Sequence, residues 1–425
     1  MRKMDTIHSI RATEILTSTG RPTVGVRLTT ARGIEVWASV PSGTSTGQYE
    51  AKVVLDGGTR YGGRGVRRAV ANVNDLIAPA LIGEPTTSQE DLDGRMIELD
   101  GTPDKHALGS NAILAVSVAL AKAGARGAGV PLYTYLGNRD AATMPVSFAT
   151  IIAGGSFAPS PLDFEDYLIA VPGASSFADS VEALVAIRAC LGERLRARFG
   201  PVPEEGTAFS PQISETPEAL DLMLQAAGDA GYGGKAVLGL DVVAGEFYDA
   251  RTDRYRIGER LLTAQELQDV YTDLVAGYPM VFVEDPYHDD DFAGFARLTA
   301  ALQGTQIVGD DLFASNPGRL ARGIEEEAGN GLLLKVNQIG TVTEACRAGR
   351  MALDVGYTVT VSLRSSDTND PFIADLAVGL GATQMKLGCP IRGERIAKYN
   401  RLLEIEADLG DRARYAGAGF VVTQG

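Results

Sequence analysis

Short apolar segments recur through the later part of the chain, and several of them end at a charged residue. Amphipathic stretches, such as residues 264–276 and 343–352, fill the intervals between them. A strand followed by a helix about every 25 residues is typical of a (β/α) barrel, although a doubly wound open sheet shows the same alternation. The charged residues at the predicted strand ends are Asp241, Glu284, Asp310, Lys335, Arg364 and Lys386.

The N-terminal part of the chain shows a different pattern. Residues 24–28 and 34–40 have the composition of strands, and Gly33 between them can adopt the positive φ of a hairpin turn. A polar loop that contains glycine follows over residues 41–47. No G-x-G-x-x-G motif follows an early strand, which weakens the dinucleotide-binding form of an open sheet.

A long apolar segment and a polar break complete this part of the chain. We expect a helix over residues 112–123, capped by Ser110 and Asn111 and ended by Gly124. The polar break near residue 140 then separates this region from the segment with recurring strands. We therefore predict two domains, over residues 1–140 and 141–425.

The composition of the 425-residue chain is that of a globular protein, with 45% hydrophobic and 22% charged residues. Its net charge of −15 disfavours nucleic acid and anionic membrane surfaces as partners. No apolar run approaches the roughly 18 residues of a membrane span, and no secretory signal pattern follows the first residues. The three cysteines are far apart and form no CxxC pair, so a reducing cytoplasm is the expected location.

The first three charged strand ends are carboxylates. Because the carboxyl ends of parallel strands meet at one mouth of a barrel, we expect Asp241, Glu284 and Asp310 to converge there. Three oxygen ligands without histidine or cysteine favour Mg²⁺ over zinc. A single acid at a strand end is more often a helix cap or an ion-pair partner, but three in succession followed by basic residues favour a metal site.

The basic strand ends are candidates for proton transfer and anion binding. A lysine in a cationic pocket loses its proton more easily, so Lys335 or Lys386 can act as a base beside a metal-stabilised enolate. Arg364 and Ser365 offer a planar guanidinium and a hydroxyl to a phosphate. Taken alone, each lysine is better explained by an ion pair with a neighbouring acid. Arg364 and Ser365 are about equally well explained by a surface arginine beside a turn serine.

Eight segments of the chain stand out as motifs. They are PSGTSTG at 41–47, LDGT at 99–102, NAIL at 111–114, EDP at 284–286, GDDLF at 309–313, LLKVNQIGT at 333–341, FIADLAVGL at 372–380 and AKYN at 397–400. In their order and spacing, over nearly the whole chain, these motifs resemble enolase. The resemblance implies an α/β protein with an N-terminal α+β capping domain and a C-terminal (β/α)8-type barrel that starts irregularly.

The resemblance also implies two Mg²⁺ ions at the barrel mouth. Asp241, Glu284 and Asp310 match the ligands of the first ion. Ser45, in the mobile loop, matches a ligand of the second ion and also lies beside the substrate. The implied substrate is 2-phosphoglycerate, a small anion.

The basic residues acquire roles through the same resemblance. Lys335 matches the base that removes the C2 proton of 2-phosphoglycerate, and Lys386 matches the lysine that holds the substrate carboxylate. Arg364 and Ser365 match the residues that bind the phosphate.

The chain departs from the enolase pattern at several positions beside the site. Phe157 and Leu363 replace two histidines, and both are expected to line the substrate. Asp166 replaces an active-site glutamate. The segment that carries the glutamate assisting hydroxide departure is one residue longer, and Glu205 is its expected replacement.

Because the metal ligands and the base are retained while the acid side is altered, we expect a specialised relative of enolase. We expect an enzyme similar to carboxyphosphonoenolpyruvate synthase of phosphonate antibiotic biosynthesis. That enzyme joins a unit derived from 2-phosphoglycerate to an activated phosphonoformate. A nucleotidyl phosphonate would then be the second substrate. The alternatives are phosphopyruvate hydratase, which makes phosphoenolpyruvate in glycolysis, and an inactive enolase-fold binding protein.

We also expect a homo-oligomer, a dimer or larger, because enolases are usually dimers. The arginine that supports the family's interface is Thr13 here, and the acid expected near the C-terminus is Ala418. If those two residues pair in relatives, both halves of the contact are missing together and the interface is rebuilt.

Overall fold

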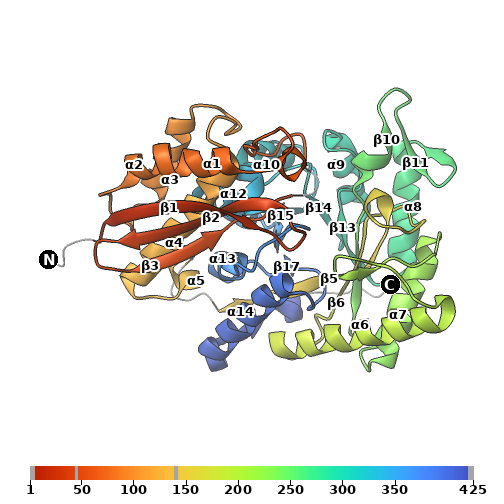
Figure 1. Cartoon of the computed structure of the whole chain (residues 1–425). Helices are drawn as coiled ribbons and strands as arrows, with labels where there is room; N and C mark the ends of the chain where they lie inside the picture. The colour runs from red at the N-terminus through yellow and green to blue at the C-terminus, as the bar shows by residue number, and fades with distance from the viewer. Residues whose placement is uncertain (1–4, 44–45, 138–141, 420–425) are drawn as a thin grey trace.

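The structure is a computed structural model that describes residues 5–43, 46–137 and 142–419. Figure 1 shows a three-stranded sheet with its helices on one side of the molecule and a barrel with surrounding helices on the other. The division into domains at residues 1–140 and 141–425 stays a prediction, and part of the expected polar break lies outside the described residues.

An antiparallel sheet forms the N-terminal part, with strand order β1-β2-β3. The predicted hairpin is confirmed as β2 and β3, and Gly33 in its turn has a φ of 82°. The pattern analysis did not identify β1, which pairs with the whole length of β2. The strands are β1 (Ile7–Leu16), β2 (Pro22–Thr30) and β3 (Glu35–Ser39), and the helices are α1 (Arg67–Ala71), α2 (Ala78–Leu81), α3 (Gln89–Asp100), α4 (Ser110–Ala128) and α5 (Leu132–Leu136).

Helix α4 differs from its prediction at both ends. Gly109, with a φ of 97°, occupies the N-cap position, and no side chain caps the helix there. The helix continues through Gly124 and ends at Gly129, which has the left-handed conformation. Gly124 is required for packing instead, because a Cβ atom there would lie 2.4 Å from the hydroxyl of Tyr135.

Eight strands close the barrel. Their order is β5-β6-β9-β13-β14-β15-β16-β17, and the pairing of β17 with β5 closes the ring, so the open-sheet alternative is wrong. Strand β6 is antiparallel to both neighbours, which is the irregular start that the resemblance implied. The strands are β5 (Val146–Ala153), β6 (Asp166–Ala170), β9 (Val237–Asp241), β13 (Met280–Glu284), β14 (Gln306–Gly309), β15 (Gly331–Leu334), β16 (Thr358–Ser362) and β17 (Gln384–Lys386).

Helices surround the barrel because its strands are apolar on both faces, as parallel strands are when helices cover them. Every residue of β9, β13 and β15 is buried. The helices are α6 (Phe177–Phe199), α7 (Thr216–Asp229), α8 (Ala264–Gly277), α9 (Phe292–Ala301), α10 (Pro317–Glu325), α11 (Val336–Ile339), α12 (Val342–Asp354), α13 (Phe372–Leu380) and α14 (Gly393–Leu409).

Short strands complete the fold at the periphery. Strands β7 and β8 form a hairpin attached to β5, and β10, β11 and β12 form a separate small sheet. The short strands are β4 (Thr143–Met144), β7 (Glu204–Glu205), β8 (Ala208–Phe209), β10 (Tyr248–Asp249), β11 (Arg254–Ile257), β12 (Arg260–Leu262) and β18 (Arg414–Tyr415).

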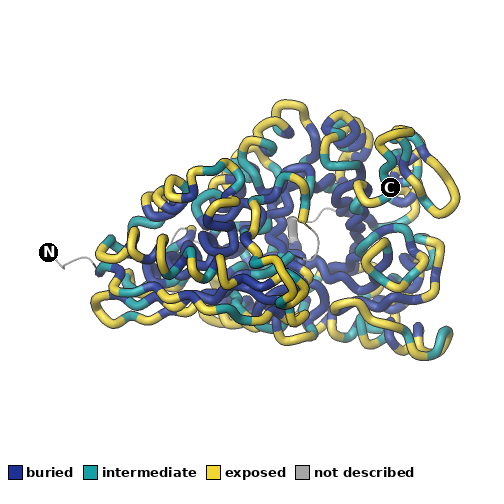
Figure 2. The backbone as a smooth tube through the Cα atoms, turned by 45° about the horizontal axis from the view of Figure 1, so that its top comes forward, coloured by how far each residue is buried: buried dark blue, intermediate teal, exposed yellow. Residues whose placement is uncertain are grey.

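Side chains from the strands fill the barrel interior. Phe148 on β5 and Phe282 on β13 lie with their ring centroids 4.7 Å apart, in a cluster that includes Leu168, Val308 and Leu333. Figure 2 shows the buried backbone through the centre of the molecule and the exposed residues on outer turns. None of the helices in the described ranges combines the length and hydrophobicity that crossing a bilayer requires.

Replacing Phe282 with alanine should destabilise the protein by about 3–5 kcal/mol, because it opens a cavity inside the barrel. Thermal unfolding followed by circular dichroism should show a lower Tm. Leu261→Ala on β12 is the control, since Leu261 is 48% exposed and its removal should change stability by about 0.5 kcal/mol or less. Equal Tm values for the two variants would contradict this account of the interior.

Candidate active site

Charged residues from the barrel strands meet around a cavity of about 550 Å³ at one end of the barrel, here called the mouth cavity. Strand β6 runs against its neighbours, so its first residue, Asp166, lies at the same end as the last residues of the parallel strands. The predicted site residues that line the cavity are Phe157, Asp166, Glu205, Asp241, Lys335, Leu363, Arg364, Ser365 and Lys386.

Three carboxylates surround the ammonium group of Lys386. Asp241 lies opposite Glu284 in the register of β9 and β13, and opposite Asp166 in the register of β9 and β6. Lys386 Nζ contacts Asp241 Oδ2 and lies 2.8 Å from Glu284 Oε2 and 3.5 Å from Asp166 Oδ2. Burial lowers the pKa of Lys386, but the carboxylates outweigh it and raise that pKa well above its usual value. Lys386 is therefore positively charged in this arrangement.

The second lysine pairs with the next acid along the barrel. Lys335 Nζ contacts Asp310 Oδ2, and Gln338 Nε2 donates a hydrogen bond of 2.7 Å to Asp310 Oδ1. Burial by itself would raise the pKa of Asp310, but the charge of Lys335 outweighs it and lowers that pKa below its usual value. Asp310 is therefore held as an anion. Its hydrogen-bond donor Gln338 was not recognised as a site residue from the sequence.

The carboxylates retain oxygen atoms that suit a cation. Asp241 Oδ1 and Glu284 Oε1 are buried and receive no hydrogen bond from any described residue. Burial, and then repulsion from Asp241, raises the pKa of Glu284 well above its usual value. A buried acceptor without a donor is costly, and a hard cation with oxygen ligands would satisfy both atoms. The donor set therefore fits Mg²⁺.

A second acidic group lies beside the first. Asp285, Asp310 and Asp311 each place a carboxylate oxygen within 4.8 Å of the others. Asp285 accepts hydrogen bonds from the backbone N–H groups of Asp310 (3.0 Å) and Asp311 (2.8 Å), so its oxygens already have donors. Asp285 orients the loop that carries Asp310, which is a role that the sequence did not indicate. Ser45, the expected ligand of the second ion, lies outside the described residues.

Arg364 is buried at the end of β16 and pairs with a residue from the N-terminal part of the chain. Its Nη1 lies 2.8 Å from Glu50 Oε2, and its Nη2 lies 3.2 Å from Glu50 Oε1. The sequence motifs pointed to Arg364 but not to Glu50. Ser365, the next residue, also lines the mouth cavity.

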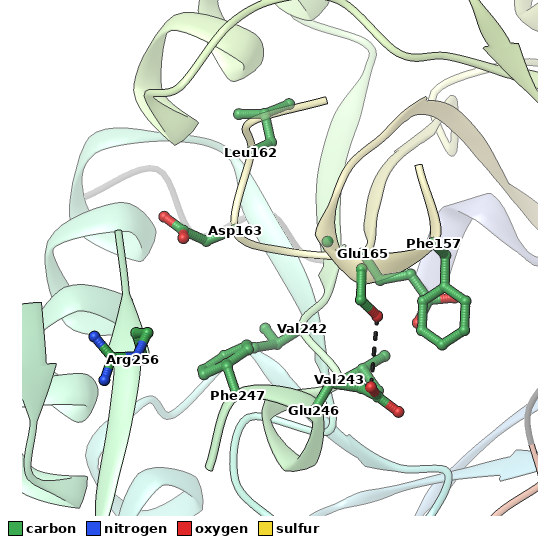
Figure 3. A pocket seen from close by; sticks show the side chains of 11 residues that line it. Phe157, Leu162, Asp163, Glu165, Val242, Val243, Glu246, Phe247 and Arg256 are labelled. Atoms are coloured by element: carbon green, nitrogen blue, oxygen red, sulfur yellow. Dashed lines mark hydrogen bonds between the residues drawn. The ribbon is translucent and has the colours of Figure 1, made fainter. Parts of the chain in front are cut away.

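The residues that depart from the enolase pattern lie in the wall of the mouth cavity. Leu363 is partly buried, and Phe157 also lines a side cavity of about 270 Å³. Figure 3 shows Phe157 and Glu165 at one side of the side cavity and Arg256 at the opposite side. Limited access to solvent, with repulsion from Asp241, raises the pKa of Glu165 well above its usual value. Glu165 is thus a titratable residue of this site that the sequence analysis missed.

Glu205 lies at the rim of the mouth cavity. It is exposed on β7, in the hairpin that β7 and β8 attach to the barrel. Its neighbour Glu204 lies 3.1 Å from Arg188 and 3.5 Å from Arg392. Glu205 is therefore an exposed residue at the rim, whereas Asp241 and Glu284 are buried.

Comparison with known proteins accounts for nearly the whole chain. The family model "Enolase, N-terminal domain" matches residues 7–136, and "Enolase, C-terminal TIM barrel domain" matches residues 141–424. The chain belongs to the enolase family. Enolases use Mg²⁺ at two sites, in agreement with the expected cofactor.

Relatives from several organisms cover the chain almost completely. An enolase of Methanopyrus kandleri is 51% identical over 97% of this chain and 98% of its own length. Enolases of Acidothermus cellulolyticus and Thermococcus gammatolerans are 48% and 46% identical, each over 97% of both chains.

These relatives correct the functional expectation drawn from Phe157 and Leu363. The expectation of a specialised enzyme similar to carboxyphosphonoenolpyruvate synthase is wrong, because relatives at 44–51% identity over nearly the full length are named enolase. A nucleotidyl phosphonate substrate and a role in phosphonate or antibiotic biosynthesis have no support. The chain belongs to the enolase family with Phe157 and Leu363 in the wall of its mouth cavity.

Addition of Mg²⁺ should raise the Tm of the protein relative to EDTA, because the ion binds buried carboxylates that unfolding disperses. At 100 times its Kd, a ligand stabilises the native state by about 2.7 kcal/mol. Asp241→Asn combined with Glu284→Gln should remove the shift in differential scanning fluorimetry. Asp411→Asn, at an exposed position, is the control and should retain it. A full shift in the double variant would refute the metal assignment.

Proposed function

We propose that this protein is a phosphopyruvate hydratase, which removes water from 2-phosphoglycerate to form phosphoenolpyruvate. The observation that carries the proposal is a cavity lined by Lys335, Lys386 and Arg364. The two lysines pair with the buried acids Asp310, Asp241 and Glu284, in a chain that is 51% identical to a protein named enolase. We also propose the domain boundary near residue 140, a cytoplasmic location and a homo-oligomer. The three cysteines all lie in described segments and form no disulfide, which supports the location.

The first step of the proposed reaction is removal of the C2 proton. Bound Mg²⁺ supplies the positive charge that stabilises a carboxylate enolate. Lys335 takes the proton, and Lys386 faces the substrate carboxylate as a cation. Burial lowers the pKa of Lys335, whereas Asp310 outweighs it and raises that pKa above its usual value. A cation held by Asp310 would weaken the attraction of that carboxylate for the ammonium of Lys335 and would favour the neutral amine that acts as a base.

The second step expels hydroxide from C3 with a proton from an acid, so that phosphoenolpyruvate and water are the products. Asp166 and Glu205 are the proposed acid-side residues. Asp166 accepts a hydrogen bond of 3.1 Å from Thr150, and burial raises the pKa of Asp166 above its usual value. A raised pKa favours the protonated carboxyl, which is the form that can give a proton to a leaving group.

The remaining residues bind the substrate. Arg364 and Ser365 are proposed to bind the phosphate, which a planar guanidinium can contact through two N–H groups. Phe157 and Leu363 are proposed to close the wall beside the substrate. Ser45 is proposed as a ligand of the second ion. Thr13, exposed on β1, leaves the oligomer interface without the family's arginine.

Purified protein with Mg²⁺ should convert 2-phosphoglycerate to phosphoenolpyruvate, which is followed by its ultraviolet absorbance. Lys335→Ala should lose both product formation and exchange of the C2 hydrogen with solvent deuterium, because it lacks the base. Hydrogen exchange by the wild type without phosphoenolpyruvate formation would reject the hydratase.

Glu205→Ala should lower the rate of dehydration while C2 hydrogen exchange continues, because only the later protonation is impaired. The two rates are measured on the same preparation, by absorbance and by NMR. Loss of a donor in the transition state typically reduces the rate by about 10²–10³-fold. An unchanged dehydration rate in Glu205→Ala would assign the acid role to Asp166. The Asp166→Asn variant is therefore measured in parallel.

A further inference from the structure

We propose that Glu50 is a positioning residue that fixes the guanidinium of Arg364 and connects it to the loop at Gly47. The inference rests on the proposed function, since it assigns the phosphate to Arg364. Glu50 comes from the N-terminal part of the chain, whereas Arg364 follows a barrel strand. The residue that orients the phosphate-binding group therefore lies outside the barrel.

The contact between the two side chains is buried and bidentate. The side chains of Arg364 and Glu50 are 5% and 6% exposed, and both terminal nitrogens of Arg364 have an oxygen of Glu50 as acceptor. A guanidinium held through two parallel hydrogen bonds cannot rotate about its long axis without breaking them. Glu50 thereby fixes the plane that Arg364 presents to a phosphate.

The same carboxylate also holds a part of the loop motif. Glu50 Oε1 accepts a hydrogen bond of 3.0 Å from the backbone N–H of Gly47, and it is the oxygen that accepts from Arg364 Nη2. Gly47 lies close to the barrel, because a Cβ atom there would lie 2.6 Å from Asp311 Oδ1. A shift of Arg364 therefore changes the position of an oxygen on which Gly47 depends.

Glu50 can serve as a fixed point because both sides of it are anchored to the barrel. On one side, the hydroxyl of Tyr49 donates to the carboxylate of Asp290 at 2.7 Å, and the guanidinium of Arg319 stacks 3.5 Å from the Tyr49 ring centroid. On the other side, the backbone N–H of Ala51 donates to the carbonyl of Gln338 at 2.7 Å. Gln338 also donates to Asp310, so one short segment touches both the phosphate side and the carboxylate side of the site.

The test is a comparison of steady-state kinetics for Glu50→Gln, Arg364→Lys and the double variant. Glu50→Gln keeps the size of the side chain but removes its charge, and its kcat/KM for 2-phosphoglycerate should fall by about 10- to 100-fold, mostly through KM. Glu50 acts through the guanidinium of Arg364. Glu50→Gln should therefore lower kcat/KM much less in the Arg364→Lys background than in the wild type.

Glu344→Gln is the matched control. It breaks another ion pair between distant segments, Lys105 Nζ to Glu344 Oε1 at 3.0 Å, without contacting Arg364. It should lower Tm and leave KM unchanged. If Glu50→Gln does not fold, Glu50→Asp, which retains the charge on a shorter side chain, takes its place with the same expected rise in KM.

The outcomes separate this inference from the proposed function. Turnover by the wild type with an unchanged KM in the Glu50 variant would refute the positioning role and leave the hydratase intact. Additive losses in the double variant would show that Glu50 acts independently of Arg364, and this would also refute the inference. No turnover by the wild type would reject the hydratase itself. In that case, calorimetric binding of 2-phosphoglycerate to the same variants tests the positioning of Arg364.

Discussion

Buried charges of opposite sign face one another at the barrel mouth, and their balance governs the geometry of the site. Asp166, Asp241 and Glu284 all lie within 3.5 Å of one ammonium group, Lys386 Nζ. Adjacent strands, about 4.8 Å apart, hold these acids closer together than they would remain in solution. The pKa values of Asp166 and Glu284 are raised in this arrangement, so one lysine does not fully compensate the three acids, and a bound cation would complete the charge balance.

The N-terminal part of the chain does more than cover the barrel mouth, because it also supplies charged side chains that pair with residues of the barrel part. Glu50 compensates Arg364 across the two parts, and Lys122 pairs with Asp370 at 2.6 Å in the same way. The Arg364–Glu50 pair is buried, so breaking it leaves an uncompensated buried charge. Binding at the mouth and contact between the two parts of the chain are thus coupled through the same side chains.

The correction of the functional expectation has a physical basis. Phe157 and Leu363 stand where the family pattern has histidines, and a changed wall is one way to admit a second substrate. Wall residues set the shape of a cavity, whereas the charged groups at the strand ends determine which reaction it supports. Those groups are all present, and the relatives that share 44–51% of the sequence are enolases.

The barrel and its charged strand ends could be predicted from the sequence, because they are local features. Apolar segments recur periodically, and parallel strands bring the residues that follow them, such as Asp241 and Lys386, to one mouth. It also contained the family motifs. Local patterns did not reveal strand β1, the cap at Gly109 or the packing of Gly124 against Tyr135, since each depends on a partner distant in sequence. The places of Glu50, Glu165 and Gln338 at the site became apparent only from the folded structure. Glu50 is an ordinary acid in a loop until folding places it, 314 residues away in sequence, against Arg364. Burial then gives that contact its strength, and burial is a property of the whole fold.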